Sequence, residues 1–329
     1  MQRRNRTLRK SVAVREMVAE TNVTPNDFIV PLFITEGKEV KEEISSMPDY
    51  FRMSLDNLKN EIDELWNLGL KSVLLFVMVP DKLKDNNCSE ALNKNGLMIR
   101  AIQTVKEKQP EMCVMTDVAL DPFSLHGHDG LVKDFEILND ETVKVLAEMS
   151  VLHATVGADF VAPSDMMDGR IGAIRKALEQ NDFTKTGILA YSAKYASCFY
   201  GPFRDALYSA PGFGDKKSYQ MDFRNRKEAI KEVLDDISEG ADVVMVKPAG
   251  SYLDIIREVK NAVHVPVAAY QVSGEYAMIK AASRNEWVNE KAAVIESLTS
   301  IKRAGADLIA TYFAKDFVKY SASVKNEHQ

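Results

Sequence analysis

The amino-acid sequence predicts an α/β protein, and within that class a (β/α)8 TIM barrel with an extended N-terminal arm. Two patterns in the sequence predict it. Short apolar runs alternate with helical patterns along the 329 residues, and one type of helix-to-strand junction recurs. No GxGxxG fingerprint follows any strand, which argues against the main alternative, a doubly wound open sheet. About 250 residues suffice for a barrel of this kind, so the chain is long enough to form one.

Eight apolar runs are the predicted strands of the barrel. In chain order they are Phe28–Ile34, Lys71–Val79, Met112–Val118, Ala158–Pro163, Gly187–Ala193, Ala241–Lys247, Val265–Gln271 and Ala306–Tyr312. Most are continuously apolar, as expected for parallel strands that are covered on both faces. Helical patterns fill the gaps, for example Ser54–Leu68, Glu141–Val156, Arg224–Glu239 and Glu290–Ala304.

A Gly-Ala-Asp segment recurs where a helix should end and a strand begin. It opens at Gly157, Gly240 and Gly305, and an apolar strand follows at once each time. Glycine ends a helix readily because it adopts the left-handed conformation without strain. The recurrence therefore supports a chain of repeated helix–strand units.

The first 25 residues are predicted to form an arm, and residues 26–329 a single barrel domain. Six basic residues precede the first acidic residue, Glu16. A transit peptide or a nucleic-acid-binding arm would look similar. We favour an arm that docks on a neighbouring subunit, because Ser11–Glu20 has the pattern of a helical turn that leads into the fold.

Composition excludes several functional classes. The formal net charge of −6 argues against a nucleic-acid surface spread over the protein. No apolar stretch is long enough to cross a membrane, and no secretory segment opens the chain. The cysteines, Cys88, Cys113 and Cys198, form no CxxC pair, so neither a disulfide framework nor a zinc knuckle is expected. This usage is typical of the cytoplasm.

Two lysines are the main candidates for catalysis. Lys194 and Lys247 each stand where an apolar run ends, and their neighbours in sequence are mainly uncharged. The carboxyl ends of barrel strands carry the chemistry of TIM-barrel enzymes. Burial next to a second cation lowers a lysine pKa, and the neutral amine can form a Schiff base with a carbonyl group. The alternative is a lysine that extends to solvent or pairs with a carboxylate.

Other polar residues also stand at predicted carboxyl ends, namely Asp117, the pair Ser164 and Asp165, Ser273 and Tyr312. Each has a simpler alternative taken singly, because serine caps helices, aspartate caps or forms ion pairs, and tyrosine buries its ring. Their shared position at one end of the barrel favours an active site.

The segment from residue 195 to 222 is predicted to be an active-site lid. It has no clear period and directly follows Lys194, and long aperiodic loops in compact domains are usually functional. Arg204, Lys216 and Gln220 could bind the carboxylate of an acidic substrate. The alternative is a surface loop with solvated basic residues.

A loop after the third predicted strand is a candidate cation site. It contains Asp121, His126, His128 and Asp129. Carboxylates favour Mg²⁺ over Zn²⁺, and a structural role for either histidine is equally open.

Several long motifs resemble those of the porphobilinogen synthase (5-aminolevulinate dehydratase) family, over almost the whole chain. They are VAPSDMMDGR (161–170), YSAKYAS (191–197), FYGPFRDA (199–206), KSYQMD (217–222), MVKP (245–248) and YQVSGEY (270–276). Gap-free motifs of this length are highly specific.

The resemblance implies a hydro-lyase that condenses two molecules of 5-aminolevulinate to porphobilinogen with loss of two waters, an early step of tetrapyrrole biosynthesis. It also implies a homo-octamer built from arm-swapped dimers. Schiff bases would form on Lys194 and Lys247. Further residues match substrate-binding positions of the family: Ser273 and Tyr312 for one carboxylate, Arg204 and Lys216 for the other, and also Gln220, Asp117 and Ser164.

The chain departs from zinc-type members of the family, which carry three cysteines at the positions of Ala119, Asp121 and Asp129. No thiolate stands there, so no zinc is expected at the active site. The aspartates resemble the magnesium-responsive branch, in which an allosteric Mg²⁺ is bound by a glutamate that matches Glu232. A solvated carboxylate on a helix face is the alternative for Glu232, and whether Asp121 and Asp129 bind a cation stays open.

Two other functions compete with the synthase. A class I aldolase-like lyase also uses a Schiff-base lysine, but it needs only one, and no glycine-rich phosphate loop is evident. A barrel that serves only as a non-catalytic scaffold would have no use for two strand-end lysines together with two carboxylate-binding sets.

Overall fold

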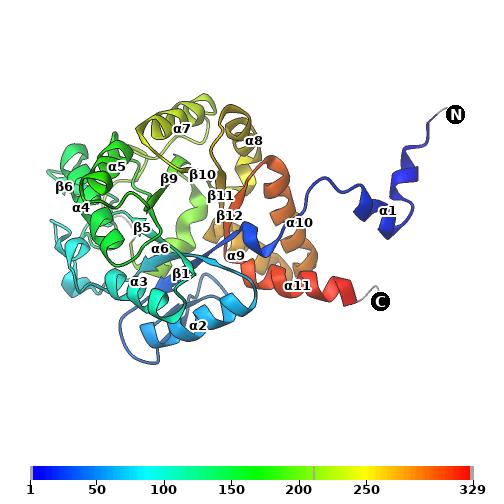
Figure 1. The fold of residues 1–329 in the computed structure, drawn as a ribbon, viewed down its shortest axis with the longest axis horizontal. Coiled ribbons are helices and arrows are strands. Elements are labelled where there is room, and N and C mark those ends of the chain that lie inside the picture. The colour runs from blue at the N-terminus through cyan, green and yellow to red at the C-terminus, as the bar shows by residue number, and fades with distance from the viewer. Residues whose placement is uncertain (1–2, 210–211, 327–329) are drawn as a thin grey trace.

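A closed barrel of parallel strands forms the centre of the molecule in the computed structural model (Figure 1). The structure describes residues 3–209 and 212–326. Round the barrel the strands are β1 (Phe28–Ile34), β4 (Ser72–Val77), β5 (Cys113–Val118), β8 (Phe160–Pro163), β9 (Gly187–Lys194), β10 (Val243–Lys247), β11 (Val267–Gln271) and β12 (Leu308–Thr311). β12 pairs with β1 and closes the ring, with Phe28 opposite Ile309. The predicted barrel is confirmed, and each predicted strand is present with ends shifted by no more than two residues.

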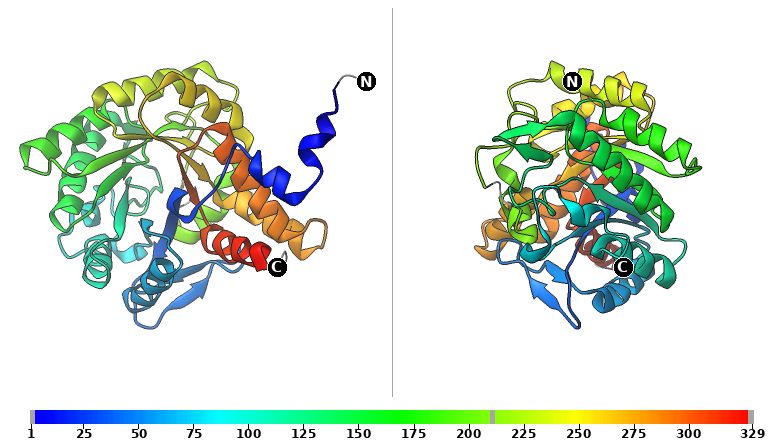
Figure 2. Two further views of the ribbon diagram at one scale, coloured as in Figure 1. Left: turned by 45° about the vertical axis from the view of Figure 1, so that its right-hand side comes forward. Right: turned by 90° about the vertical axis from the view of Figure 1, so that its left-hand side faces the viewer.

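Helices surround the barrel and cover its outer face (Figure 2). They are α2 (Leu55–Asn67), α3 (Leu97–Lys108), α4 (Asn139–Thr155), α5 (Arg170–Gln180), α6 (Gly201–Leu207), α7 (Lys227–Glu239), α8 (Leu253–Ala262), α9 (Ser273–Arg284), α10 (Glu290–Ala304) and α11 (Ala314–Asn326). Two short antiparallel pairs add to them, β2 (Lys41–Glu43) with β3 (Phe51–Met53), and β6 (Leu131–Lys133) with β7 (Glu136–Leu138). The strands are buried on both faces, which explains their continuously apolar sequences.

The recurring Gly-Ala-Asp segments stabilise the amino end of the barrel. Their glycines have positive φ angles of 100°, 112° and 125°, as predicted for the ends of α4, α7 and α10. The aspartates, Asp159, Asp242 and Asp307, each accept a hydrogen bond from a backbone amide at the start of a neighbouring strand, at 2.7–2.8 Å. Each also pairs with a basic side chain. This polar ring lies at the end opposite the lysines.

The N-terminal segment extends away from the barrel (Figures 1 and 2). It contains a short 3-10 helix, Asn5–Arg9, and α1 (Val12–Met17), whose first turn is capped by the Ser11 hydroxyl. Neither helix buries a residue, and Leu8, Val12 and Met17 are exposed. Docking of this arm on a second subunit stays a prediction.

No helix among the described residues is long and apolar enough to span a membrane. Cys88, Cys113 and Cys198 are free thiols.

Candidate active site

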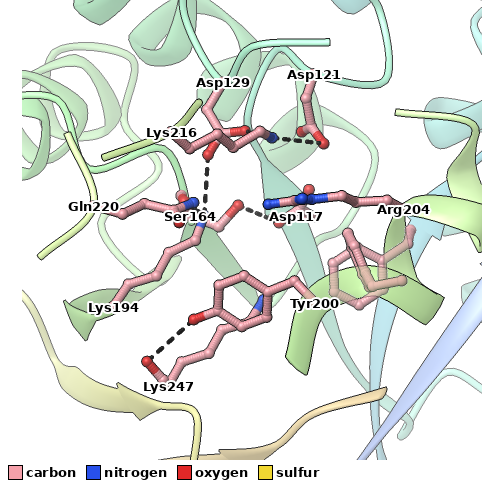
Figure 3. A pocket seen from close by; sticks show the side chains of 12 residues that line it. Asp117, Asp121, Asp129, Ser164, Lys194, Tyr200, Arg204, Lys216, Gln220 and Lys247 are labelled. Carbon is pink, nitrogen blue, oxygen red and sulfur yellow. Dashed lines mark hydrogen bonds and ion pairs between the residues drawn. The ribbon is translucent and has the colours of Figure 1, made fainter. Parts of the chain in front are cut away.

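The two strand-end lysines lie next to each other at the carboxyl end of the barrel (Figure 3). Lys194 is the last residue of β9 and Lys247 is the last residue of β10, and the two are paired in register. Both side chains are buried and line one cavity. The other residues that line it are Phe76, Asp117, Asp121, Asp129, Ser164, Tyr200, Phe203, Arg204, Lys216 and Gln220.

Lys247 is surrounded by aromatic rings. Its Nζ lies 4.7 Å from the ring centre of Tyr270 and 5.0–5.1 Å from those of Tyr191, Tyr200 and Phe203. Ring faces favour the ammonium form modestly. Burial and the charge of Lys194 oppose that effect and lower the pKa of Lys247 to about 7. A large fraction of Lys247 is therefore a neutral nucleophilic amine at neutral pH.

Lys194 has a charged partner, as in the alternative in which a strand-end lysine pairs with a carboxylate. Its Nζ lies 3.1 Å from Oδ2 of Asp129 and also donates a hydrogen bond to the Ser164 carbonyl. The partner comes from the loop after β5, 65 residues earlier in the chain. After burial, the charge of Lys194 is the next reason why Lys247 is easier to deprotonate.

Asp121 and Asp129 contact lysines in this structure. Lys216 Nζ lies 2.5 Å from Asp129 Oδ1 and 3.6 Å from Asp121 Oδ2. Burial alone would raise the pKa of Asp129, but the charges of Lys194 and Lys216 outweigh it and hold this pKa at about 2. Asp129 therefore stays ionised and orders two of the cavity's cations.

Asp117 and Ser164 meet at the ends of β5 and β8. The Ser164 hydroxyl donates a hydrogen bond of 2.7 Å to Asp117 Oδ1. Burial, with the nearby charge of Asp121, raises the pKa of Asp117 to about 7. Asp117 can thus accept or donate a proton near neutral pH. Asp165 does not line the cavity, because it bonds the Met167 amide and faces Arg170 at 3.7 Å.

The segment predicted to be a lid lines part of the cavity. It supplies Tyr200, Phe203 and Arg204 from around α6, and Lys216 and Gln220 from the loop that follows. Part of that loop, residues 210–211, is outside the described residues. The returning chain is tied to the barrel, because the Met221 amide donates to the Lys194 carbonyl at 3.0 Å.

His128 anchors the same loop. Its ring nitrogens lie 3.1 Å from the Tyr219 hydroxyl and from the Phe213 carbonyl. The position of this histidine fits the structural role rather than a metal ligand, since both nitrogens have protein partners.

Ser273 and Tyr312 do not line this cavity. Ser273 begins α9, and its hydroxyl accepts a 2.9 Å hydrogen bond from the Phe203 amide of the lid. Tyr312 shares a 3.0 Å hydrogen bond with Tyr270, one of the rings around Lys247. Both residues are buried directly behind the aromatic lining. The Ser273 hydroxyl, which was predicted to bind one substrate carboxylate, is therefore already hydrogen-bonded to α6, the lid helix.

Glu232 lies in a separate pocket. It stands on α7, and the pocket is also lined by Asp168, Glu228 and the lid residue Gln220. Burial raises the pKa of Glu232. Within residues 3–209 and 212–326, no group of three or more His, Cys, Asp or Glu side chains is placed to hold a metal ion.

Three aromatic residues of the site were not predicted from the sequence: Phe76, Tyr200 and Phe203. Phe76 is one of several apolar residues in β4 and has no distinguishing local signal. Tyr200 and Phe203 lie inside the predicted lid, where their spacing beside Arg204 could have indicated the apolar face of a short helix.

The fold and site together define a class of protein: a TIM-barrel enzyme with two buried amines side by side, suited to Schiff-base chemistry on carbonyl substrates. The family model described as delta-aminolevulinic acid dehydratase matches residues 2–320. The chain therefore belongs to the delta-aminolevulinic acid dehydratase family.

Individual relatives agree with this assignment. The delta-aminolevulinic acid dehydratase of Bacillus subtilis is 52% identical over 319 residues, which cover 97% of this chain and 98% of the relative. That of Chlamydia pneumoniae is 50% identical and covers 95% of both chains. A crystal structure of the Toxoplasma gondii enzyme, in complex with the reaction product porphobilinogen, matches with a TM-score of 0.95 and 48% identity. It covers 97% of this chain and 92% of that one.

Proposed function

We propose that the chain is a hydro-lyase that condenses two molecules of 5-aminolevulinate to porphobilinogen with loss of two waters. The observation that carries the proposal is the pair of buried lysines, Lys194 and Lys247, in register at the ends of β9 and β10. Two identical keto acids need two covalent holding points. A single lysine would hold one substrate and leave the second to collide in the correct orientation.

Lys247 is the amine that is ready to react. Its neutral form attacks the ketone of one substrate, and loss of water gives an imine. The protonated imine withdraws electrons, which acidifies the adjacent carbon and activates the imine carbon towards attack. Asp117, whose pKa is about 7, is the neighbouring group that can move the proton.

Lys194 holds the second substrate in the same way after it has lost its proton. Two imines in register convert a bimolecular encounter into an oriented reaction, an effect that can contribute about 7–11 kcal/mol. Bond formation between the substrates then expels the amines again, so both lysines are regenerated. The lid residues Tyr200 and Phe203 exclude water, which would hydrolyse the imines.

The substrate carboxylates bind to basic and hydroxyl side chains of the lid and the barrel rim. Arg204 and Lys216 line the cavity with Gln220 and supply charge for one carboxylate. The other carboxylate binds Ser273 and Tyr312, which requires Phe203 to leave the Ser273 hydroxyl.

Trapping with borohydride separates the synthase from the two alternatives. Reduction in the presence of 5-aminolevulinate is expected to label both Lys194 and Lys247, as read by peptide mass spectrometry. Label on one lysine alone would favour an aldolase-like lyase. The absence of any label would favour a non-catalytic scaffold and reject the proposal.

Mg²⁺ is the proposed metal, and Glu232 the residue that holds it. Mg²⁺ is commonly bound through one or two carboxylates and retains several waters, which suits a half-buried glutamate in a pocket with Asp168 and Glu228. No thiolate stands at Ala119, Asp121 or Asp129 to favour Zn²⁺. A cation role for Asp121 and Asp129 would require their lysine partners to move.

Mg²⁺ is expected to raise activity, and a zinc-selective chelator to leave it nearly unchanged. Glu232→Gln should remove the response to Mg²⁺ while the activity without Mg²⁺ is kept. Light scattering with and without Mg²⁺ gives a second measurement, since the predicted homo-octamer of arm-swapped dimers should depend on the ion. Strong inhibition by the chelator, with activity restored only by Zn²⁺, would overturn the metal assignment.

The proposed location is the cytoplasm, supported by the free thiols.

A further inference from the structure

A buried arginine outside the cavity holds one end of the lid helix. Arg52 belongs to β3, which pairs with the carboxyl end of β1. The side chain is only 4% exposed. Its Nη1 donates hydrogen bonds to the carbonyls of Asp205 and Ala206, at 3.2 and 3.1 Å. These are among the last carbonyls of α6, which have no partner within the helix.

The residue that ends α6 also contacts Arg52. Tyr208 follows the helix with a φ of 50°, and its hydroxyl accepts a 3.2 Å hydrogen bond from Nη2 of Arg52. The guanidinium lies 4.7 Å from the centre of the Tyr208 ring. A cation is favourable at the C-terminal end of a helix, and a planar guanidinium can bond several acceptors at once. Glu42 neutralises the charge at 2.8 Å.

The helix that Arg52 holds carries part of the active site. Phe203 and Arg204 of α6 line the cavity, and the Phe203 ring lies 5.1 Å from Nζ of Lys247. At its N-terminal end the helix is held by Ser273, through the Phe203 amide. If a substrate carboxylate binds the Ser273 hydroxyl, the hydrogen bond between Ser273 and the Phe203 amide is lost. The hydrogen bonds from Arg52 to the C-terminal end of the helix then remain.

We propose that Arg52 is a positioning residue for the reaction: it anchors the C-terminal end of α6 and sets the position in which Phe203 and Arg204 close the cavity over Lys247. Arg52 touches neither the cavity nor the lysines, so it acts through the helix. The expected change in KM rests on the proposed function, whereas the anchoring of α6 by Arg52 does not.

The kinetic consequence follows from populations. Substrate binds productively when α6 is in the closed position, so the apparent affinity falls in proportion to the closed fraction. At saturating substrate, binding shifts the equilibrium of α6 back to the closed position. Loss of the anchor should therefore raise KM more than it lowers kcat.

The test compares Arg52→Gln with Arg52→Lys and with Arg175→Gln. Arg175 is a matched control at the opposite end of the barrel, where it also bonds two backbone carbonyls, of Gly240 and Thr186, and one carboxylate, of Asp242. Steady-state kinetics with 5-aminolevulinate give KM and kcat, and hydrogen–deuterium exchange reports on the peptide that covers residues 201–209.

Arg52→Gln is expected to raise KM about tenfold, with a much smaller change in kcat, and to speed exchange in α6. Arg52→Lys keeps the charge with fewer donors and should fall between Gln and wild type. Arg175→Gln should lower Tm and leave KM and α6 exchange unchanged. If Arg52→Gln fails to fold, Tyr208→Phe, which removes only one acceptor, should show a smaller effect of the same kind.

Unchanged KM and unchanged α6 exchange in Arg52→Gln would overturn the inference, and so would an equal effect of Arg175→Gln on both. Faster exchange with unchanged KM would show that the anchor does not set the catalytic position. The exchange measurement needs no substrate, so it distinguishes a failure of this inference from a failure of the proposed function.

Discussion

Replacing Lys247 by methionine is expected to abolish porphobilinogen formation while the barrel stays folded. The variant removes the amine that forms the imine, and loss of a covalent nucleophile typically lowers kcat by about a thousandfold or more. Methionine has nearly the same length, packs well against aromatic rings and carries no charge that burial would penalise. The measurements are a colorimetric pyrrole assay and a thermal unfolding curve, in which Tm should be equal to or above that of the wild type.

Lys260→Met is the matched control for Lys247→Met. Lys260 lies on α8 and pairs with Asp307 at the amino end of the barrel, the end opposite the cavity. Its replacement should lower Tm slightly and retain turnover. Appreciable pyrrole formation by Lys247→Met would contradict the assigned role of this lysine.

The sequence was sufficient to predict the barrel and the placement of the two lysines, because both depend on local patterns and on topology. A continuously apolar run indicates a strand covered on both faces, and the residue after it must lie at the carboxyl end. Lys194 and Lys247 end successive parallel strands, so their proximity follows once the barrel is recognised. The left-handed glycines at the ends of α4, α7 and α10 were also predictable, because that conformation favours glycine.

The ion pair of Lys194 was not predictable from its neighbours in sequence. Its partner Asp129 is 65 residues away, and only the folded loop after β5 brings the two together. The hydrogen bond between the Phe203 amide and the Ser273 hydroxyl was unpredictable for the same reason, since the two residues are 70 positions apart in the chain. Periodicity specifies elements and their ends, whereas contacts between loops depend on how those loops pack.

The two lysines have different environments, and this difference gives them different roles. Lys247 is surrounded by rings, and burial, with the charge of Lys194, lowers its pKa to about 7. Lys194 instead forms an ion pair with Asp129, whose pKa is held at about 2. One lysine thus contacts a carboxylate directly, whereas the other is surrounded by aromatic rings.

Replacing Asp129 by asparagine is expected to lower the free energy of unfolding at neutral pH by about 3 kcal/mol. The change leaves Lys194 buried without its counter-ion, and Lys216 with Asp121 alone at 3.6 Å. The Asp129 pKa is about 2 in the folded protein and about 3.9 in an unfolded chain. Its stabilising effect is therefore complete above about pH 4 and is lost as the pH falls through about 2. The difference between wild type and variant in urea unfolding should shrink accordingly.

Asp222→Asn provides the control for this pH dependence. Asp222 also has a pKa of about 2, from hydrogen bonds with Arg224, but it is exposed to solvent, where ion pairs contribute little to stability. Its replacement should leave the unfolding curve nearly unchanged at every pH. Asp129→Asn should in addition reduce labelling of Lys194 by borohydride and 5-aminolevulinate, because the amine then keeps only the Ser164 carbonyl to position it. A variant as stable as the wild type at pH 7, or a stability difference that persists undiminished in acid, would show that Asp129 does not organise the cations of the site.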